Sequence, residues 1–467
     1  MNLSVKEKAA YGVGAVGKDM VYMLSASYVL YYYQDLLGVS AIAMGVILLV
    51  ARIFDAFNDP IMGIVVAKTR TKWGKFRPWL IIGTVTNAVI LFLMFAAPPS
   101  ANGDGLVAYA AIFYILWGVT YTMMDIPYWS MIPAFTEGGK EREGLTTLAR
   151  SCAGVGSALV TIFTMIVVHA IGGNNEIVGF KYFSLIIAIL FIAFIAITCI
   201  FIKEKATVDM QTASVGQMFK ALVQNDQAMA VVVAIVLINC SIYITSNLVI
   251  YFFKYDFGGT EWFNSYTLFN MFGGAIQILS MMIFYPLLRK FATNMKIFYI
   301  CLGSAIIGYA VLLGIAFTSM SNVFILFIPG FFIFAANGVL QVLTTIFLAN
   351  TVEYGELKNG RRDESVIFSM QTFVVKLASG IAAFIASVCL SIFSLQSGTE
   401  VSEADKAIDF SLQVPQSSQV GLRMTMTIIP IIGLIISIIW FGSKYILTDE
   451  KVTEITATLK GKNGAQA

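Results

Sequence analysis

The chain has few of the residues from which most enzyme sites are built. Only 12% of its 467 residues are charged, and it has a single histidine, His169. Its five cysteines show no CxxC spacing and lie in or at the edges of apolar stretches, where they are better interpreted as packing residues than as metal or redox ligands. We therefore predict no cofactor and no enzymatic activity, and we expect any proton chemistry to depend on carboxylates.

The shortage of charge also excludes an ordinary soluble domain, in which about a quarter of the residues are charged. The chain is 58% hydrophobic, with a mean hydropathy of +0.81. Its apolar runs are long enough to cross a hydrocarbon core of about 30 Å, and no cleavable signal peptide is predicted at the N-terminus. The fold class predicted is an all-α polytopic membrane protein with twelve transmembrane helices. The expected spans are 10–33, 41–66, 78–97, 106–133, 148–171, 182–202, 228–253, 265–288, 295–317, 322–352, 366–394 and 422–446.

The basic residues predict the orientation of these spans. Most Lys and Arg residues fall in the two terminal segments and in the loops that follow even-numbered spans, whereas the opposite loops contain only four. Because basic loops stay in the cytoplasm, both termini are expected there. The net charge of +3 reflects this asymmetry, so we predict no nucleic-acid partner.

A long basic loop divides the twelve spans into two sets of six, an arrangement typical of secondary transporters, whose substrate site lies between the halves. The predicted organisation is an N-terminal six-helix bundle (1–202), a central cytoplasmic loop (203–227), a C-terminal six-helix bundle (228–447) and a cytoplasmic tail (448–467). The tail is polar and is expected to be disordered.

Two aspartates in the second span, Asp55 and Asp59, are the most informative feature of the chain. A spacing of four residues places both carboxylates on one helix face, roughly 6 Å apart. One ionised side chain at mid-bilayer costs about 2.5–3.5 kcal/mol, so two aligned acids are expected to have a function. Arg52 shares their face and Asn58 offers a neutral oxygen. One arginine cannot neutralise two acids, which favours a cation site over an ion pair that only locks two helices together.

A second polar stripe lies on the fourth span. Tyr121, Thr122, Asp125, Tyr128 and Trp129 follow helical spacing and share one face. A carboxylate can accept hydrogen bonds from adjacent sugar hydroxyls, and an aromatic ring can cover the apolar C–H face of the sugar. The stripe therefore favours a sugar site, although aromatic residues at this spacing often belong to a packed core.

Further charged residues occur deep in other spans. Lys18 and Asp19 follow a glycine-rich run, 11–17, that is expected to be flexible; Arg150 opens the fifth span, and Lys376 follows Gln371 and Thr372 in the eleventh. These acids and bases come close to balance. They could neutralise one another, line a polar cavity, or do both.

Five ordered stretches together resemble the glycoside–pentoside–hexuronide:cation symporters, and within that family most closely the melibiose carriers. The similarity runs from about residue 6 to residue 447. The matching stretches are Tyr11-Gly12 with Gly17-Lys18-Asp19, Ala51-Arg52 with Asp55 and Asn58-Asp59-Pro60, Lys72-Trp73-Gly74-Lys75-Phe76 with Pro78-Trp79, Asp125-Ile126-Pro127 with Trp129-Ser130, and Thr351-Val352-Glu353-Tyr354-Gly355-Glu356.

The resemblance implies a major-facilitator-type fold that moves a sugar together with Na⁺, Li⁺ or H⁺. It implies a division of labour among the polar residues. The cation ligands would be Asp55, Asn58, Asp59 and Thr122, and the sugar would be surrounded by Lys18, Asp19, Tyr121, Asp125, Trp129, Arg150, Gln371, Thr372 and Lys376.

Two positions depart from the pattern of the family. Gln341 replaces a tryptophan that lines the pocket of melibiose carriers, and Asn350 replaces an aspartate. The sugar is therefore left open among galactosides, other disaccharides and glucosides.

The loops after the fourth and tenth spans are equivalent in the two halves. Arg142 and Arg150 in the first, and Glu353 and Glu356 in the second, are expected to meet when the cavity opens outward, as partly exposed ion pairs worth under about 1 kcal/mol.

The leading hypothesis is a sugar:cation symporter in a bacterial cytoplasmic membrane that functions as a monomer, with the sugar and the lipid bilayer as its partners. A transporter of a non-sugar amphiphile such as a lysolipid is the nearer alternative, but it would need a wide apolar cavity. A cation channel or sensor is the other, but a channel usually shows rings of charge from identical subunits.

Overall fold

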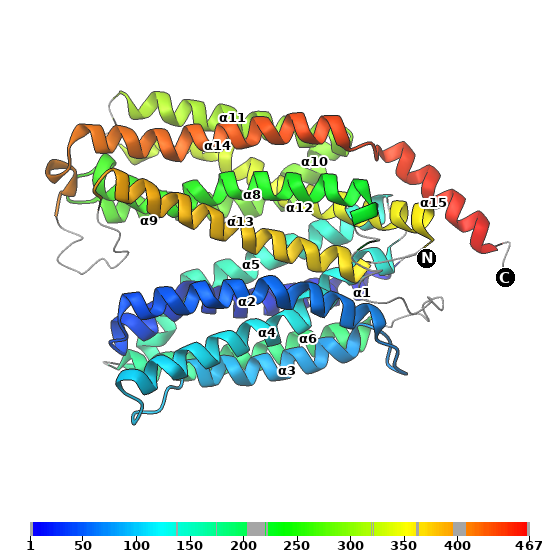
Figure 1. Cartoon of the computed structure of the whole chain (residues 1–467), viewed down its shortest axis with the longest axis horizontal. Coiled ribbons are helices and arrows are strands. Elements are labelled where there is room, and N and C mark those ends of the chain that lie inside the picture. Colours follow the sequence, from blue (N-terminus) through cyan, green and yellow to red (C-terminus); the bar gives the residue numbers. More distant parts are fainter. Residues whose placement is uncertain are drawn as a thin grey trace. The chain divides into compact units, whose positions relative to one another are not determined.

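In the computed structural model, the described residues are 3–136, 139–173, 175–202, 220, 223–318, 320, 322–360, 364–395 and 408–464, and across these ranges every regular element is a helix (Figure 1). The chain divides into two compact units. The first comprises Met1–Ala228, Leu348–Phe373 and Glu450–Ala467, and the second comprises Met229–Phe347 and Val374–Asp449.

The first unit contains six long helices from the N-terminal half. They are α1 (Val5–Tyr31), α2 (Ala41–Lys68), α3 (Arg77–Met94), α4 (Gly103–Phe135), α5 (Gly139–Gly172) and α6 (Glu176–Phe201). Helix α1 packs against α5 and α6, whereas α4 packs against α2 and α3. The α1 N-terminus is closed by a capping box in which Ser4 and Glu7 bond each other's backbone amides, a pattern that begins a helix firmly.

The second unit is built mainly from the helices of the C-terminal half. They are α8 (Asp226–Phe252), α9 (Trp262–Leu279), α10 (Tyr285–Arg289), α11 (Asn294–Ala316), α12 (Val323–Asn359), α13 (Glu364–Ile392) and α14 (Gln416–Lys444). Helix α11 packs against α14. The last turns of α12 and the first third of α13 belong to the first unit.

Each expected span coincides with one long helical segment, with α9 and α10 joined through a π-helical turn, η3 (Ser280–Phe284). Within the described residues, ten helices are long and apolar enough to cross a membrane by length and composition alone. The chain is a multi-pass membrane protein.

The glycine-rich run at 11–17 forms a regular helix, so the expectation of flexibility there was wrong. These glycines let neighbouring helices approach. A Cβ atom on Gly14 would lie 2.3 Å from Thr198 Oγ1 of α6, and one on Gly17 would lie 2.9 Å from Phe194 Cβ. From the other side, a Cβ atom on Gly156 of α5 would lie 2.3 Å from the Val16 carbonyl oxygen. The run is a close-packing surface.

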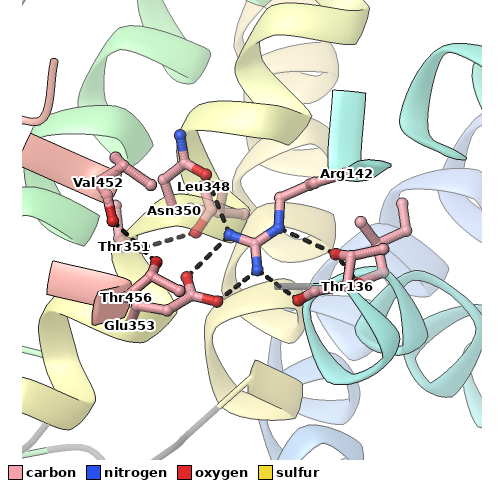
Figure 2. Close-up of polar contacts among 9 residues, drawn as sticks. Thr136, Arg142, Leu348, Asn350, Thr351, Glu353, Val452 and Thr456 are labelled. Atoms are coloured by element: carbon pink, nitrogen blue, oxygen red, sulfur yellow. Dashed lines mark hydrogen bonds and ion pairs between the residues drawn. The ribbon is translucent and has the colours of Figure 1, made fainter. Parts of the chain in front are cut away.

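The polar tail was also predicted incorrectly, because most of it is a helix, α15 (Asp449–Gly464). Val452 supplies the apolar contact that a disordered tail would lack, since its side chain is buried. Figure 2 shows Val452 and Thr456 beside Thr351 and Glu353 of α12. The expected central loop, 203–227, lies mostly outside the described residues.

Candidate functional site

The two aspartates of α2 both face α4. Asp59 is fully buried, and Thr122 Oγ1 donates a 2.8 Å hydrogen bond to Asp59 Oδ1. Asp55 lies one turn earlier against Gly118, where an added Cβ atom would lie 2.9 Å from Asp55 Oδ1. The helical spacing therefore does align the carboxylates, and α4 accommodates one with a hydroxyl and the other with a glycine.

One amide side chain directly precedes Asp59 in the sequence. Asn58 lies on the same helix, half-buried, beside Asp59. The side chain of Arg52 is outside the described part of the structure. No group of three or more His, Cys, Asp and Glu residues that could hold a metal ion occurs among the described residues. Two carboxylates with a hydroxyl and an amide are oxygen donors, which hard cations prefer.

A second cluster forms where α1 meets α4. The buried Lys18 Nζ lies 2.8 Å from Asp125 Oδ1, 3.0 Å from Asp19 Oδ2 and 3.2 Å from the Tyr121 hydroxyl. One ammonium group therefore contacts two carboxylates and a phenol. Lys18 has three N–H donors and can satisfy all three partners, but its single positive charge faces two negative charges.

Trp129 covers the other side of this cluster. Its indole Nε1 donates a 3.1 Å hydrogen bond to Asp125 Oδ1, and the Lys18 Nζ atom lies 4.9 Å from its ring centroid. The Arg150 guanidinium carbon lies 3.9 Å from the same centroid. These are cation–π distances. The structure thus brings together the six predicted sugar-binding residues of the N-terminal half: Lys18, Asp19, Tyr121, Asp125, Trp129 and Arg150.

The predicted residues of the C-terminal half lie on α13. Gln371 is buried and Thr372 is half-buried, with its hydroxyl bonded to the Phe368 carbonyl. Both belong to the first unit, whereas Lys376 belongs to the second. Gln341, at the position of the missing tryptophan, is half-buried on α12 in the second unit. A part for these α13 residues in a sugar site stays a prediction.

Arg142 and Glu353, expected to pair across the two loops, do meet (Figure 2). Arg142 donates through both terminal nitrogens to the Glu353 carboxylate, with Nη1 2.8 Å from Oε2. Nη1 also bonds Asn350 Oδ1 at 3.0 Å, while Nε and Nη2 bond the hydroxyl and carbonyl of Thr136. Arg142 is only 1% exposed, so the pair is buried and not partly exposed as expected.

The other two predicted partners have different surroundings. Arg150 lies over Trp129 and so belongs to the cluster at α1 and α4. Glu356 lies one turn beyond Glu353 on α12, half-buried. The α12 end is held further by Asn225, whose side-chain amide donates to the Thr351 carbonyl at 2.8 Å.

A second buried pair in the first unit was missed by the sequence analysis. Lys75 Nζ lies 3.7 Å from Glu364 Oε2, and both side chains are buried. Lys75 belongs to the basic loop between α2 and α3, and Glu364 begins α13. The loop was noticed only as a matching motif; nothing local in the sequence indicated its partner 289 residues away.

Comparisons with known proteins agree with this architecture. Residues 10–449 match the family described as MFS/sugar transport protein. The protein named uncharacterized symporter YjmB, of Bacillus subtilis (strain 168), is 27% identical over 99% of this chain and 96% of its own length. A lactose permease of Lactobacillus delbrueckii subsp. bulgaricus is 26% identical over 99% of this chain and 74% of its own length.

A solved structure supports the fold. The MFS proton:xylose symporter XylE, bound to 6-bromo-6-deoxy-D-glucose, aligns with a TM-score of 0.60 at 13% identity, covering 91% of this chain and 94% of the other. At that identity the likeness concerns the fold alone. The family match confirms the predicted relationship to the glycoside–pentoside–hexuronide symporters. The chain therefore belongs to the MFS/sugar transport protein family, whose members are membrane transporters and not enzymes.

Proposed function

We propose that this protein is a symporter that carries a glycoside, such as a disaccharide of the galactoside type, together with Na⁺, Li⁺ or H⁺. The observation that carries the proposal is that two different polar sites share helix α4. Thr122 bonds Asp59 on one side, while its neighbour Tyr121 bonds Lys18 in the other cluster. The names of the relatives, a symporter and a lactose permease, support the same substrate class and mode of transport.

In the sugar site, each residue has a role that follows from its chemistry. The carboxylates of Asp125 and Asp19 accept hydrogen bonds from adjacent hydroxyls, and Lys18 and Arg150 donate. Trp129 presents a ring face to the apolar C–H face of the sugar. Gln371 and Thr372, which belong to the same unit, are assigned to the sugar as further hydrogen-bonding groups, and Lys376 is kept as a predicted sugar ligand. Because Trp129 Nε1 and Lys18 already bond Asp125, that carboxylate is held in place before the sugar arrives.

In the cation site, Asp55, Asn58, Asp59 and Thr122 supply oxygen ligands. Two acids binding one monovalent cation leave excess negative charge when the cation departs, and filling the site offsets it. Because the sites share α4, each ligand should raise the affinity for the other by the same factor. One charge crossing about 100 mV supplies roughly 2.3 kcal/mol, which allows about fiftyfold sugar accumulation.

Alternating access needs barriers that open and close. We assign one barrier to the buried network of Arg142 with Glu353 and Asn350, with Glu356 on the same helix end. The orientation expected from the basic loops puts this network and both termini on the cytoplasmic side of a bacterial inner membrane. The network would then close the cytoplasmic side while the cavity is open outward. A single chain holds both sites, so a monomer is sufficient.

The function can be tested by transport into proteoliposomes. A panel of one-ring and two-ring glycosides is offered with and without Na⁺, and with and without a pH gradient. Uphill uptake of at least one glycoside, stimulated by one of the ions, is expected. The Asp59→Cys variant should lose uphill transport but keep sugar binding, whereas Asp125→Ala should lose sugar binding but keep cation binding. Uptake that is indifferent to both ions would contradict symport, and unaltered uphill transport in Asp59→Cys would contradict the cation site.

A further inference from the structure

A row of aromatic side chains continues beyond the proposed sugar site along α1 and α4. On α4, Tyr114 and Trp117 precede Tyr121 at helical spacing, and on α1, Tyr22 follows Lys18 by one turn. We call Tyr22, Tyr114 and Trp117 the aromatic shelf. The sugar site already described uses none of them. Tyr121 links the two, since its hydroxyl bonds Lys18 while its ring packs on the shelf.

The rings of the shelf are stacked in order along α4. Trp117 stacks on Tyr121 with 5.3 Å between ring centroids and 21° between planes, and Tyr114 stacks on Trp117 at 6.0 Å and 20°. Tyr22 closes the α1 side, 6.2 Å from Trp117 and 5.5 Å from Tyr121. Four residues of helix advance about 6 Å, so Trp117 lies about 12 Å along α4 from Asp125, with Tyr121 midway.

One polar atom on the shelf has no partner. Trp117 is only 7% exposed, and its indole Nε1 makes no hydrogen bond within the described residues. Buried tryptophan N–H groups usually find an acceptor, and three other indole donors in the described residues do: Trp129 bonds Asp125, Trp79 bonds Thr69 and Trp440 bonds the Ala230 carbonyl. An orphaned donor among ring faces matches the chemistry of a second sugar ring, which offers C–H faces and hydroxyl or ether oxygens.

We propose that the aromatic shelf is a second subsite, which binds the outer ring of a two-ring glycoside while its first ring occupies the Lys18, Asp125 and Trp129 cluster. Trp117 donates its N–H from the ring edge to an oxygen of the outer ring, and the ring of Tyr22 covers the apolar side of that sugar ring. The shelf thereby selects two-ring over one-ring glycosides. This inference rests on the proposed sugar transport and narrows its substrate to two-ring glycosides.

The test compares ligands that share a first ring. The pairs are methyl β-D-galactoside with lactose, methyl α-D-galactoside with melibiose, and methyl α-D-glucoside with maltose, with binding to the purified protein measured by calorimetry. Trp117→Phe keeps a stacking ring but removes the donor. It should weaken binding of the two-ring ligand by about three- to tenfold, as the loss of one neutral hydrogen bond predicts. The affinity for the matching one-ring ligand should change less than about twofold. Trp440→Phe, which removes an indole donor in the second unit, should leave the ratio of the two affinities unchanged.

A second variant keeps the inference testable if Trp117→Phe does not fold. Tyr22→Leu removes the aromatic ring on the α1 side, where Tyr22 is half-buried. Like Trp117→Phe, it should lower the ratio of two-ring to one-ring affinity. Equal losses for one-ring and two-ring ligands, or unchanged selectivity in both variants, would show that the shelf is only packing. Failure of the parent protein to bind any glycoside is a different result, because it would overturn the proposed transport of sugars together with this subsite.

Discussion

Tyr11 and Tyr128 join α1 to α4 with a reciprocal pair of hydrogen bonds. The Tyr11 hydroxyl donates to the Tyr128 carbonyl at 2.6 Å, and the Tyr128 hydroxyl donates to the Tyr11 carbonyl. The rings are parallel to within 3° and their centroids are 4.4 Å apart. Both residues are fully buried. Since Tyr128 directly precedes Trp129, and Tyr11 lies two turns before Lys18, the pair sets how the two halves of the Lys18 cluster align.

Removing one hydroxyl of this pair should affect sugar binding as well as stability. Tyr11→Phe keeps the ring stack but removes the phenol donor to the Tyr128 carbonyl, which should cost about 0.5–1.5 kcal/mol. The matched control is Tyr33→Phe, which removes a similar buried bond to the Met94 carbonyl far from the cluster. Both variants should melt earlier, but only Tyr11→Phe should lower sugar affinity in calorimetry. Equal sugar affinity in the two variants would count against the alignment role.

Adding one methyl group to α4 should impair the cation site. In Gly118→Ala the new Cβ atom would lie 2.9 Å from Asp55 Oδ1, too close to fit without a shift of the carboxylate. We expect weaker cation binding, measured as a rise in the cation concentration that half-maximally stimulates sugar binding. Gly105→Ala on the same helix meets nothing within 4 Å and is the control. A normal cation response in Gly118→Ala would mean that Asp55 is not a ligand.

The buried Arg142 and Glu353 pair should be far more sensitive to neutralisation than an exposed pair in the same unit. Arg142→Gln leaves the Glu353 carboxylate buried without its cation, a change that typically costs about 3–5 kcal/mol. The Lys358 and Asp226 pair is about half-exposed at both side chains, so Asp226→Asn should cost under about 1 kcal/mol. Thermal unfolding of the purified variants measures both. If Arg142→Gln and Asp226→Asn lower the stability by similar amounts, the buried network contributes little to the stability of this conformation.

A corresponding pair in the second unit gives an independent test. The side chain of Asp256 is completely buried and receives two 2.5 Å hydrogen bonds from Arg423, at Nε and Nη2. Arg423→Gln should therefore destabilise the protein by about 3–5 kcal/mol. Arg289→Gln breaks a more exposed pair with Asp449 in the same unit and should cost under about 1 kcal/mol. A small effect of Arg423→Gln on the melting temperature would contradict this account.

Much of the architecture could be predicted from local sequence alone. Apolar runs of sufficient length determine where the spanning helices lie, because a helix that satisfies its own backbone is the structure that hydrocarbon permits. The spacing of Asp55 and Asp59, and the stripe from Tyr121 to Trp129, determine which side chains share a face, because a helix turns once every 3.6 residues. These features need no knowledge of any other helix.

Which helices meet was decided only by the tertiary structure. Lys18 and Asp125 are 107 residues apart, and Arg142 and Glu353 are 211 apart; periodicity places each on a face but does not select its partner. The same limitation explains the three errors. Glycines at 11–17 were expected to be flexible because their neighbours α5 and α6 were unknown, and the tail after Leu447 was expected to be disordered because its polar composition does not reveal that Val452 is buried. The Arg142 and Glu353 pair was expected to be partly exposed because the groups that cover it come from distant segments. Helical periodicity is a property of a short segment, whereas burial and ion pairing depend on surfaces that distant segments provide.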